Sequence, residues 1–241
     1  MFQQVIPLRT ADAVFGQVRD QIVGGGLTPG DALPAERELS QQLGVSRGVV
    51  REALQRLAQA GLVDIKQGGS TRVRDYRTST DMDLLQRLLV RADKSIDPRV
   101  LRSLLEMRIS IGAHAARLCA ERADAATRAL LGRIVDQLEA EPSVARQQDI
   151  DLKFWGSIID GSQNIVYRLA YNGLVATYHP LRDVISAVVE PELRNISGHR
   201  RMVSAIARGK PAEAERAARL VLESSSGHWA KLLDALNWEE Q

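Results

Sequence analysis

The stretch LPAERELSQQLGVSRGVVREALQRLAQAGLVDIKQGGSTRV, from Leu33 to Val73, decides the fold of the N-terminal part of the chain. Pro34 suits the first turn of a helix about nine residues long, which Gly44 ends. Ser46 is a favourable N-cap for the helix that follows. Two alternating segments then surround Gln67-Gly68-Gly69-Ser70, which predicts a two-stranded hairpin with a glycine turn.

A further helix is predicted upstream of this stretch. Apolar residues repeat every four positions across residues 10–23, the period of an amphipathic helix. The order helix, helix, helix, hairpin indicates one domain at 1–75. The polar, aperiodic sequence that follows is typical of a linker, so a linker and connecting helix are expected at 76–95.

Helical periodicity dominates the rest of the chain, where strand patterns almost vanish. Residues 96–241 are therefore predicted to form an all-helical bundle of six or seven helices, and the fold class is mainly α. Proline separates several helices, as at Glu190-Pro191, and Pro180 is expected to bend or split one of them. The helical stretches are 82–92, 98–122, 125–140, 146–160, 164–189, 192–208 and 211–236.

Composition narrows the class of protein. The chain has 241 residues, with 32 Lys and Arg against 30 Asp and Glu, for a net charge of +2. This balance excludes a uniformly basic, histone-like protein, so any contact with nucleic acid requires a local patch. The single cysteine, Cys119, excludes a disulfide framework and multi-cysteine metal sites. Because no secretion signal or membrane-spanning apolar run is visible, a cytoplasmic protein is expected.

The first domain contains such a basic patch. Between residues 41 and 74, six basic side chains face two acidic ones, for a local charge of +4. Arg47 and Arg51 lie at the start of the third helix, where a recognition helix presents side chains to the major groove. Arginine pairs well with guanine, and the scarcity of aromatic residues disfavours stacking on single strands. Duplex DNA is therefore the predicted partner, and a solvated helix face is the alternative.

The run from Leu33 to Val73 resembles the winged helix-turn-helix of GntR-type bacterial transcription regulators. By this resemblance we expect a homodimer, with each subunit presenting one winged helix to half of a palindromic operator. The hairpin tip lacks bulk and is expected to approach the minor groove or the DNA backbone. The residues expected at the DNA interface are Arg37, Ser46, Arg47, Gly48, Arg51, Gln67, Gly68 and Gly69.

The helical domain resembles that of the FadR-like, or FCD, branch of this superfamily. The resemblance implies a metal held by an Asp, a His four residues later on the same helix and two further His on later helices. Here Asp151 and His199 match two of these ligands, whereas Trp155 and Val221 stand at the other two positions. With half of the ligands missing, neither a metal nor another cofactor is expected.

The residues that replace the ligands indicate an apolar effector pocket. Trp155 and Val221 join an aromatic-rich part of the chain, and this departure resembles the acyl-CoA-responsive regulators of the branch. Arg108 is expected to supply a cation for a carboxylate, thioester or phosphate group, with Tyr178 and His199 donating hydrogen bonds. Short motifs of the same resemblance add Asn172 and Trp229 to the effector site, which also includes Asp151.

Bland alternatives exist for these residues. The aromatic side chains would equally suit an ordinary bundle core, and Arg108 would equally suit a buried ion pair with Glu106, Asp151 or a carboxylate of another helix. An enzyme that uses Asp151 and His199 as an acid-base pair is disfavoured, because the sequence shows no recognisable set of nucleophile, base and orienting residue and no phosphate-binding loop. An effector-blind architectural DNA binder is a further alternative.

The sequence therefore predicts a non-enzymatic, DNA-binding transcription regulator whose operator binding is controlled by a ligand in the C-terminal domain. Fatty acyl-CoA or a fatty acid is the predicted ligand, in keeping with control of fatty-acid metabolism. A regulator responding to a small carboxylate, such as a sugar acid or an organic acid, is the alternative within the same family.

Overall fold

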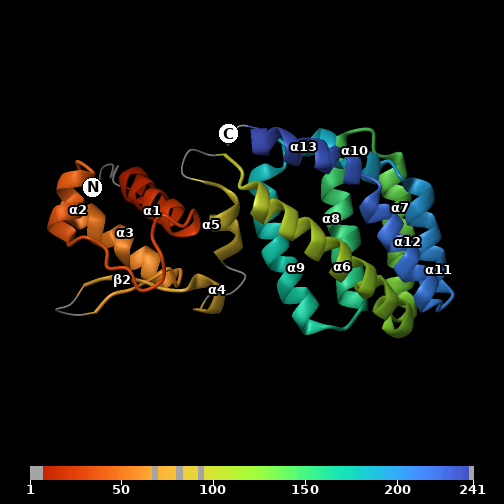
Figure 1. Cartoon of the computed structure of the whole chain (residues 1–241). Coiled ribbons are helices and arrows are strands. Elements are labelled where there is room, and N and C mark those ends of the chain that lie inside the picture. The colour runs from red at the N-terminus through yellow and green to blue at the C-terminus, as the bar shows by residue number, and fades with distance from the viewer. Residues whose placement is uncertain (1–7, 67–69, 80–83, 92–94, 239–241) are drawn as a thin grey trace, which may run out of the picture. The chain divides into compact units, whose positions relative to one another are not determined.

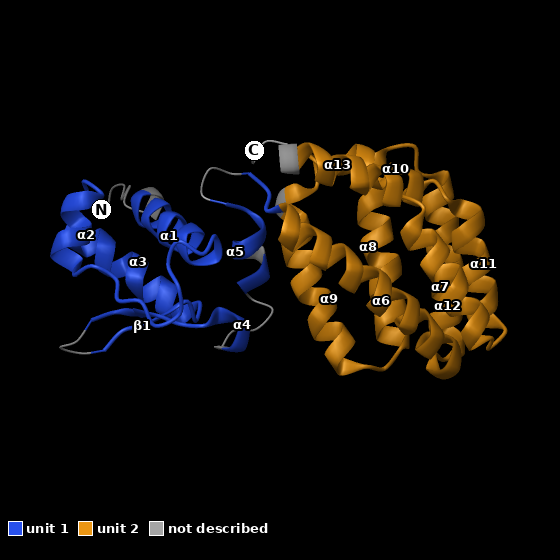
Figure 2. Ribbon diagram, viewed as in Figure 1, with its two compact units in different colours: residues 1–97 blue, residues 98–241 orange. Residues whose placement is uncertain are grey.

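The computed structural model describes residues 8–66, 70–79, 84–91 and 95–238. Two compact units make up the chain, Met1–Asp97 and Pro98–Gln241 (Figure 2). In the part of the chain that is described, no helix has both the length and the apolar character needed to cross a membrane.

The first unit has the predicted order of three helices and a hairpin (Figure 1). The hairpin is antiparallel and pairs Val63 with Val73. Ser46 caps α3 as expected, since its hydroxyl accepts a hydrogen bond from the Val49 amide at 3.4 Å. The hairpin tip, 67–69, lies outside the described residues. The elements are α1 (Leu8–Val23), α2 (Glu36–Gln42), α3 (Arg47–Gln59), β1 (Val63–Asp64) and β2 (Arg72–Val73).

The core of this unit joins the apolar faces of α1 and α3. Val14 and Val18 of α1 are buried together with Val50, Leu54 and Leu57 of α3. These residues follow the helical spacing that the sequence showed, so the hydrophobic effect fixes the rotation of both helices. As a result, the polar face of α3 stays in solvent.

The segment predicted as linker and connecting helix contains α4 (Tyr76–Ser79) and α5 (Leu85–Leu89). This segment clusters with the first unit. Leu84 and Leu89 are buried, and the guanidinium of the buried Arg19 in α1 donates to the carbonyl oxygens of Arg87 and Val90. Arg19 therefore binds carbonyl groups at the C-terminal end of α5, where a cation is favourable.

The second unit is an all-helical bundle. Its described residues form eight α-helices, more than the six or seven predicted, because two of the predicted stretches are each divided in two. Pro180 lies in a 3₁₀ turn, η2 (His179–Leu181), that divides the stretch 164–189 as expected. The helices are α6 (Pro98–Arg122), α7 (Ala125–Ala140), α8 (Val144–Gly161), α9 (Ile165–Tyr178), α10 (Ser186–Leu193), α11 (Ile196–Ala207), α12 (Pro211–Glu223) and α13 (Ser226–Trp238).

The predicted helix boundary at Glu190-Pro191 is wrong. Pro191 lies inside α10, where it removes only the one hydrogen bond that its missing N–H would have donated. The boundary falls instead at Asn195, whose side-chain oxygen accepts from the Gly198 amide at 3.0 Å and so caps α11.

Helix α6 lies at the centre of the packing and contacts α8, α9, α11, α12 and α13. Its buried face includes Ala113, Ala115, Ala116 and Ala120, whose small side chains let neighbouring helices approach closely. The large side chains of the core come instead from α7, α8 and α11. Residues that project from several helices toward α6 can therefore meet inside the bundle.

Candidate DNA-binding surface and effector site

The start of α3 and the first turn of α2 present exposed arginine side chains, with Glu36 and Glu38 in the same turn of α2. Arg37, Ser46, Arg47 and Gly48 are exposed. The guanidinium groups of Arg37 and Arg47 make no hydrogen bond or ion pair with another described residue. A Cβ atom at Gly48 would meet only the Ser46 hydroxyl, at 3.9 Å, so the helix N-terminus is sterically open. Free guanidinium groups beside an open helix N-terminus suit the phosphates and base edges of a DNA groove.

Arg51 differs from the other two arginines. Its guanidinium donates to both carboxylate oxygens of Glu36 at 2.7–3.2 Å, which joins α3 to α2. These hydrogen bonds lower the pKa of Glu36, so the carboxylate is ionised at neutral pH. The sequence placed Arg51 at the DNA interface, and the structure shows that its charge is shared with Glu36.

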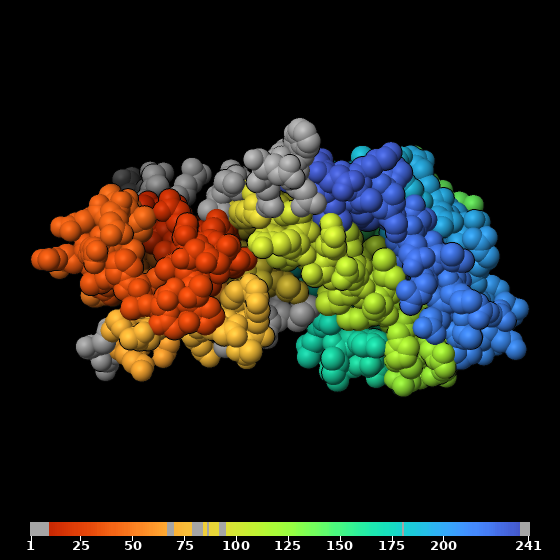
Figure 3. Space-filling view, in the orientation of Figure 1, coloured from red at the N-terminus to blue at the C-terminus, as the bar shows by residue number. Residues whose placement is uncertain are grey.

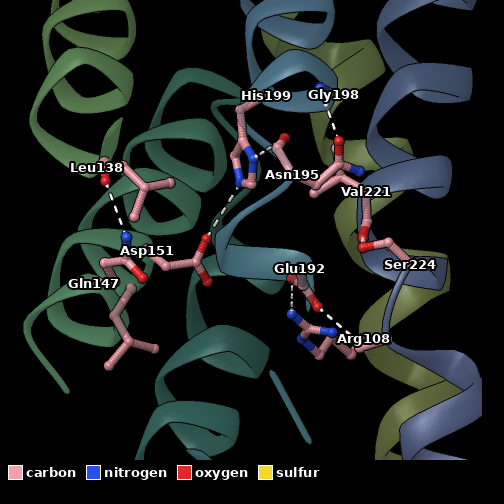
Figure 4. A network of polar contacts seen from close by, with 12 residues as sticks. Arg108, Leu138, Gln147, Asp151, Glu192, Asn195, Gly198, His199, Val221 and Ser224 are labelled. Carbon is pink, nitrogen blue, oxygen red and sulfur yellow. Dashed lines mark hydrogen bonds and ion pairs between the residues drawn. The ribbon is translucent and has the colours of Figure 1, made fainter. Parts of the chain in front are cut away.

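A cluster of charged side chains lies inside the helical domain (Figure 4). Arg108 from α6 and Glu192 from α10 form an ion pair, and Glu192 is buried with 1% of its side chain exposed. The hydroxyl of the buried Ser225, which directly precedes α13, donates to the other oxygen of Glu192 at 3.2 Å. Glu192 therefore links α6 and α10 to the start of α13.

His199 of α11 belongs to the same cluster and is fully buried. Its Nδ1 lies 2.9 Å from the Asn195 carbonyl oxygen, to which it donates, and its Nε2 faces Asp151 Oδ1 at 3.5 Å. Burial lowers the pKa of His199, but Asp151 and the Asn195 carbonyl raise it more, so the net shift is upward. The pair on α8 and α11 thus favours a positive imidazole beside a negative carboxylate.

Burial shifts the other titratable groups of the cluster. It raises the pKa of Glu192 despite the neighbouring Arg108. It also raises the pKa of Tyr178, with a further contribution from Asp151, so this hydroxyl stays protonated and able to donate. The pKa of Arg108 moves upward in spite of burial, because Glu192 stabilises the charged guanidinium. The cluster therefore presents donors and acceptors in a largely dry environment.

Some of these polar atoms are weakly paired or unpaired. The buried Asp151 Oδ1 and His199 Nε2 face each other at 3.5 Å without a well-formed hydrogen bond, and the buried Trp155 Nε1 makes no hydrogen bond within the described structure. Asp151 and Trp155 lie four residues apart on one face of α8, and Asp151 faces His199. A buried polar atom without a partner costs about 1–3 kcal/mol, so such atoms mark a place where a polar group can bind.

Each of the two units matches a known protein family. Residues 10–73 match the gntR family of bacterial regulatory proteins, and residues 103–224, about half of the chain, match the FCD domain. The chain belongs to the GntR family. More narrowly, it is a DNA-binding, non-enzymatic transcription regulator of the FadR-like, FCD subfamily.

Relatives of this GntR regulator carry different functional names. It is 38% identical to the HTH-type transcriptional regulator Mce2R of Mycobacterium tuberculosis, over 92% of each chain. The fatty acid metabolism regulator protein of Edwardsiella ictaluri is 32% identical over 62% of this chain and 61% of the relative. An Escherichia coli protein named for the L-lactate dehydrogenase operon is 34% identical over 77% of this chain and 69% of the relative.

The metal site of the FCD family does not fit the residues of this regulator. Trp155 and Val221 cannot ligate a metal, which leaves Asp151 and His199 as two ligands out of four. Val221 lies close to α11, since a Cβ atom added at Gly198 would be 2.8 Å from its Cγ2 atom. Within the described residues, no three His, Cys, Asp or Glu side chains converge to hold a metal ion.

The structure distributes the predicted effector residues unevenly. Arg108, Asp151, Tyr178 and His199 interact electrostatically within one cluster. Trp155 and Val221 are buried in the core beside it, and Trp229 is buried on α13. Asn172 is exposed on α9 and is therefore not part of the buried cluster.

Sequence reasoning missed Glu192, Ser225 and Asn195. It allowed for an ion pair between Arg108 and a carboxylate of another helix, and the structure identifies that carboxylate as Glu192. Glu106, the nearer candidate in sequence, is exposed on α6. The only local signal for Glu192 was its place after Pro191, which does not reveal that the side chain points inward.

Proposed function

We propose that this regulator binds its operator through the start of α3 and releases it when a fatty acyl ligand occupies the helical domain. The ligand is an acyl-CoA or a free fatty acid, and the genes that the regulator controls act in fatty-acid metabolism. The observation that carries this proposal is the buried, weakly hydrogen-bonded Asp151–His199 pair together with the unpartnered Trp155 Nε1, beside apolar core side chains. A ligand with a polar head and an apolar chain satisfies both parts of such a site.

On the DNA side, we assign base and phosphate contacts to Arg37, Ser46, Arg47, Gly48 and Arg51. The free guanidinium of Arg47 at the first position of α3 makes it the strongest candidate for a base contact. Two subunits, each with one such helix, match a palindromic operator. Arg47→Ala should therefore weaken specific binding by about 1–3 kcal/mol. The charge-matched control is Arg133→Ala, which removes an exposed arginine of α7 in the helical domain.

On the effector side, we assign the head group to Arg108, His199 and Tyr178, and the acyl chain to the side of Trp155. Arg108 is held by Glu192, so an acidic head group must compete with Glu192 for the guanidinium. Displacement of Glu192 would also break its hydrogen bond with Ser225 and loosen the start of α13. Effector binding would in this way change the structure of the bundle at the start of α13. The fatty acid metabolism regulator among the relatives agrees with this ligand class.

A small carboxylate is the second candidate effector. It is favoured by the density of donors and acceptors around His199 and by the relative named for the L-lactate dehydrogenase operon. Such a ligand would use Arg108 and His199 in the same way but would leave Trp155 as part of the core.

The test is an operator gel shift with the full chain, on a duplex obtained by selection from random sequences. The complex is titrated separately with oleoyl-CoA, oleate, L-lactate and succinate. Release by the two fatty ligands alone supports the proposal, and release by the small acids alone refutes it in favour of the second candidate. Trp155→Ala should reduce sensitivity to oleate while Asn172→Ala, which changes an exposed side chain, leaves it unchanged.

A further inference from the structure

A second polar feature lies on the surface of the helical domain, between α11 and α12. Three residues with Gly209 at their centre join the two helices, so they run antiparallel as a helical hairpin. Part of this hairpin forms the blue surface at the right of Figure 3. A cleft of about 480 Å³ lies between the helices. Its residues are Arg200, Arg201, Ser204, Ala205, Arg208, Glu213, Arg216, Ala217 and Leu220.

The sequence explains why a cleft forms there. Small side chains at Ser204 and Ala205 on α11 and at Ala217 on α12 contribute little bulk between the helices. Longer side chains, Arg201 from α11 and Arg216 from α12, lie on the two sides of this small-residue strip. The cleft is therefore built by the alternation of small and long side chains at helical spacing.

The charges in the cleft are not balanced internally. Arg200 pairs with Asp136 and Glu139 of α7, and Arg208 pairs with Glu213 at 2.9 Å. Arg201 and Arg216, in contrast, make no hydrogen bond or ion pair with any described residue.

This lack of partners is unusual in the helical domain, where most arginines bind a carboxylate or a carbonyl oxygen, as Arg128 and Arg168 do. Two unpaired guanidinium groups from opposite helices thus meet at one cleft. Ser204 adds a hydroxyl group that makes no hydrogen bond with any described residue.

From this arrangement we infer that the α11–α12 cleft binds an organic phosphate. Guanidinium groups donate two parallel hydrogen bonds to phosphate oxygens, and a hydroxyl donates a third kind of contact. The volume lies within the range of organic ligand sites and exceeds what a bare phosphate ion needs. Leu220, which is 60% exposed at the edge of the cleft, offers an apolar contact for the rest of such a ligand. A nucleoside diphosphate has this combination of groups.

The cleft is separate from the effector cluster. His199 points into the bundle from α11, while Arg201, two residues later, is exposed to solvent. The organic phosphate site therefore does not depend on the fatty acyl proposal, and the two can be tested independently.

The experiment is isothermal titration calorimetry on the full chain with ADP, pyrophosphate and citrate. ADP and pyrophosphate should bind with dissociation constants below about 1 mM, and citrate more weakly. Arg201→Ala and Arg216→Ala should each weaken ADP binding on the order of tenfold, because each removes one charged donor. Arg133→Ala, an exposed arginine that also lacks a partner but lies outside the cleft, is the matched control and should bind ADP like the parent.

Three results would overturn the inference. The first is an absence of ADP and pyrophosphate binding by the parent chain, and the second is binding that survives in both cleft variants. The third is loss of operator affinity in the cleft variants without any effect on ADP, which would make the cleft a DNA backbone contact. Arg133, Arg201 and Arg216 are all exposed, so the three variants should fold, and circular dichroism checks this.

Discussion

Removing Arg108 should destabilise the helical domain strongly, because Glu192 would then be buried without its cation. The informative set of variants is Arg108→Met, Glu192→Gln and the double variant. Methionine retains much of the arginine's length and apolar stem while removing the charge, and glutamine keeps the shape of glutamate.

The magnitude follows from burial. Only 1% of the Glu192 side chain is exposed, so water cannot replace the lost guanidinium. Breaking a buried pair from one side costs about 3–5 kcal/mol of unfolding free energy, and Arg108→Met should fall in this range. Glu192→Gln should cost less, since 20% of the Arg108 side chain remains exposed to solvent. The double variant should be more stable than Arg108→Met, because no uncompensated charge remains.

The effect should also depend on pH. Burial raises the pKa of Glu192 above its ordinary value of 4.5, and removal of Arg108 raises this pKa further. The carboxyl is neutral in both folded and unfolded chains below the unfolded pKa, so the penalty is smallest there. It grows as the pH rises toward the folded pKa, where the unfolded chain ionises and the folded one does not.

Urea unfolding followed by tryptophan fluorescence measures this domain selectively, since Trp155, Trp229 and Trp238 are the only tryptophans and all lie in the helical domain. The reasoning is refuted if Arg108→Met costs less than about 1 kcal/mol at pH 7. It is equally refuted if the double variant loses the sum of the two single losses, because the pair would then not be coupled.

Three further predictions concern packing, thiol chemistry and DNA binding. Gly161→Ala should lower the free energy of unfolding by about 1–3 kcal/mol, because the new Cβ would lie 2.6 Å from Cys119 Sγ. The control is Gly132→Ala in α7, whose new Cβ meets nothing within 4 Å and which should raise the free energy of unfolding by about 0.5–1 kcal/mol. Equal effects of the two substitutions in urea unfolding would contradict the packing argument. Burial raises the pKa of the Cys119 thiol from 9.0 to about 11, which lowers the fraction of reactive thiolate in the folded chain. Iodoacetamide at pH 8 should therefore alkylate the folded chain about 100-fold more slowly than the unfolded chain. Comparable rates would show that the thiol is not protected. Glu36→Gln should tighten operator binding several-fold in a gel shift, because it frees Arg51 and removes a negative charge next to the DNA; unchanged affinity would show that Arg51 does not contact DNA.

Much of the first unit could be predicted because its signals are local. Apolar residues four positions apart, a serine N-cap and a glycine turn are each recognised within a few residues. The helices and the hairpin can therefore be predicted from the sequence. The helical content of the second unit followed from the same periodicity. Helix boundaries were less accurate, since Pro191 is tolerated inside α10 and Asn195 supplies the cap that ends the connection.

The candidate site was only partly predictable. Arg108, Asp151 and His199 were identified individually from the resemblance, and the structure brings them into one cluster. The partner of Arg108 is 84 residues away in the sequence, and no local pattern reveals a contact across such a separation. The same holds for Arg51, whose carboxylate partner lies 15 residues earlier on another helix.

The sequence by itself determined that a winged helix-turn-helix precedes a helical FCD domain and that the family's metal ligands are incomplete. These properties depend on residue identity and short-range spacing. Only the tertiary structure decided which charges are satisfied and which are free. Arg108 forms an ion pair with Glu192, and Arg51 forms one with Glu36. In contrast, Arg47, Arg201 and Arg216 form no ion pair with a described residue. The physical reason is that an ion pair requires two side chains within a few ångströms, and helix packing alone sets that distance.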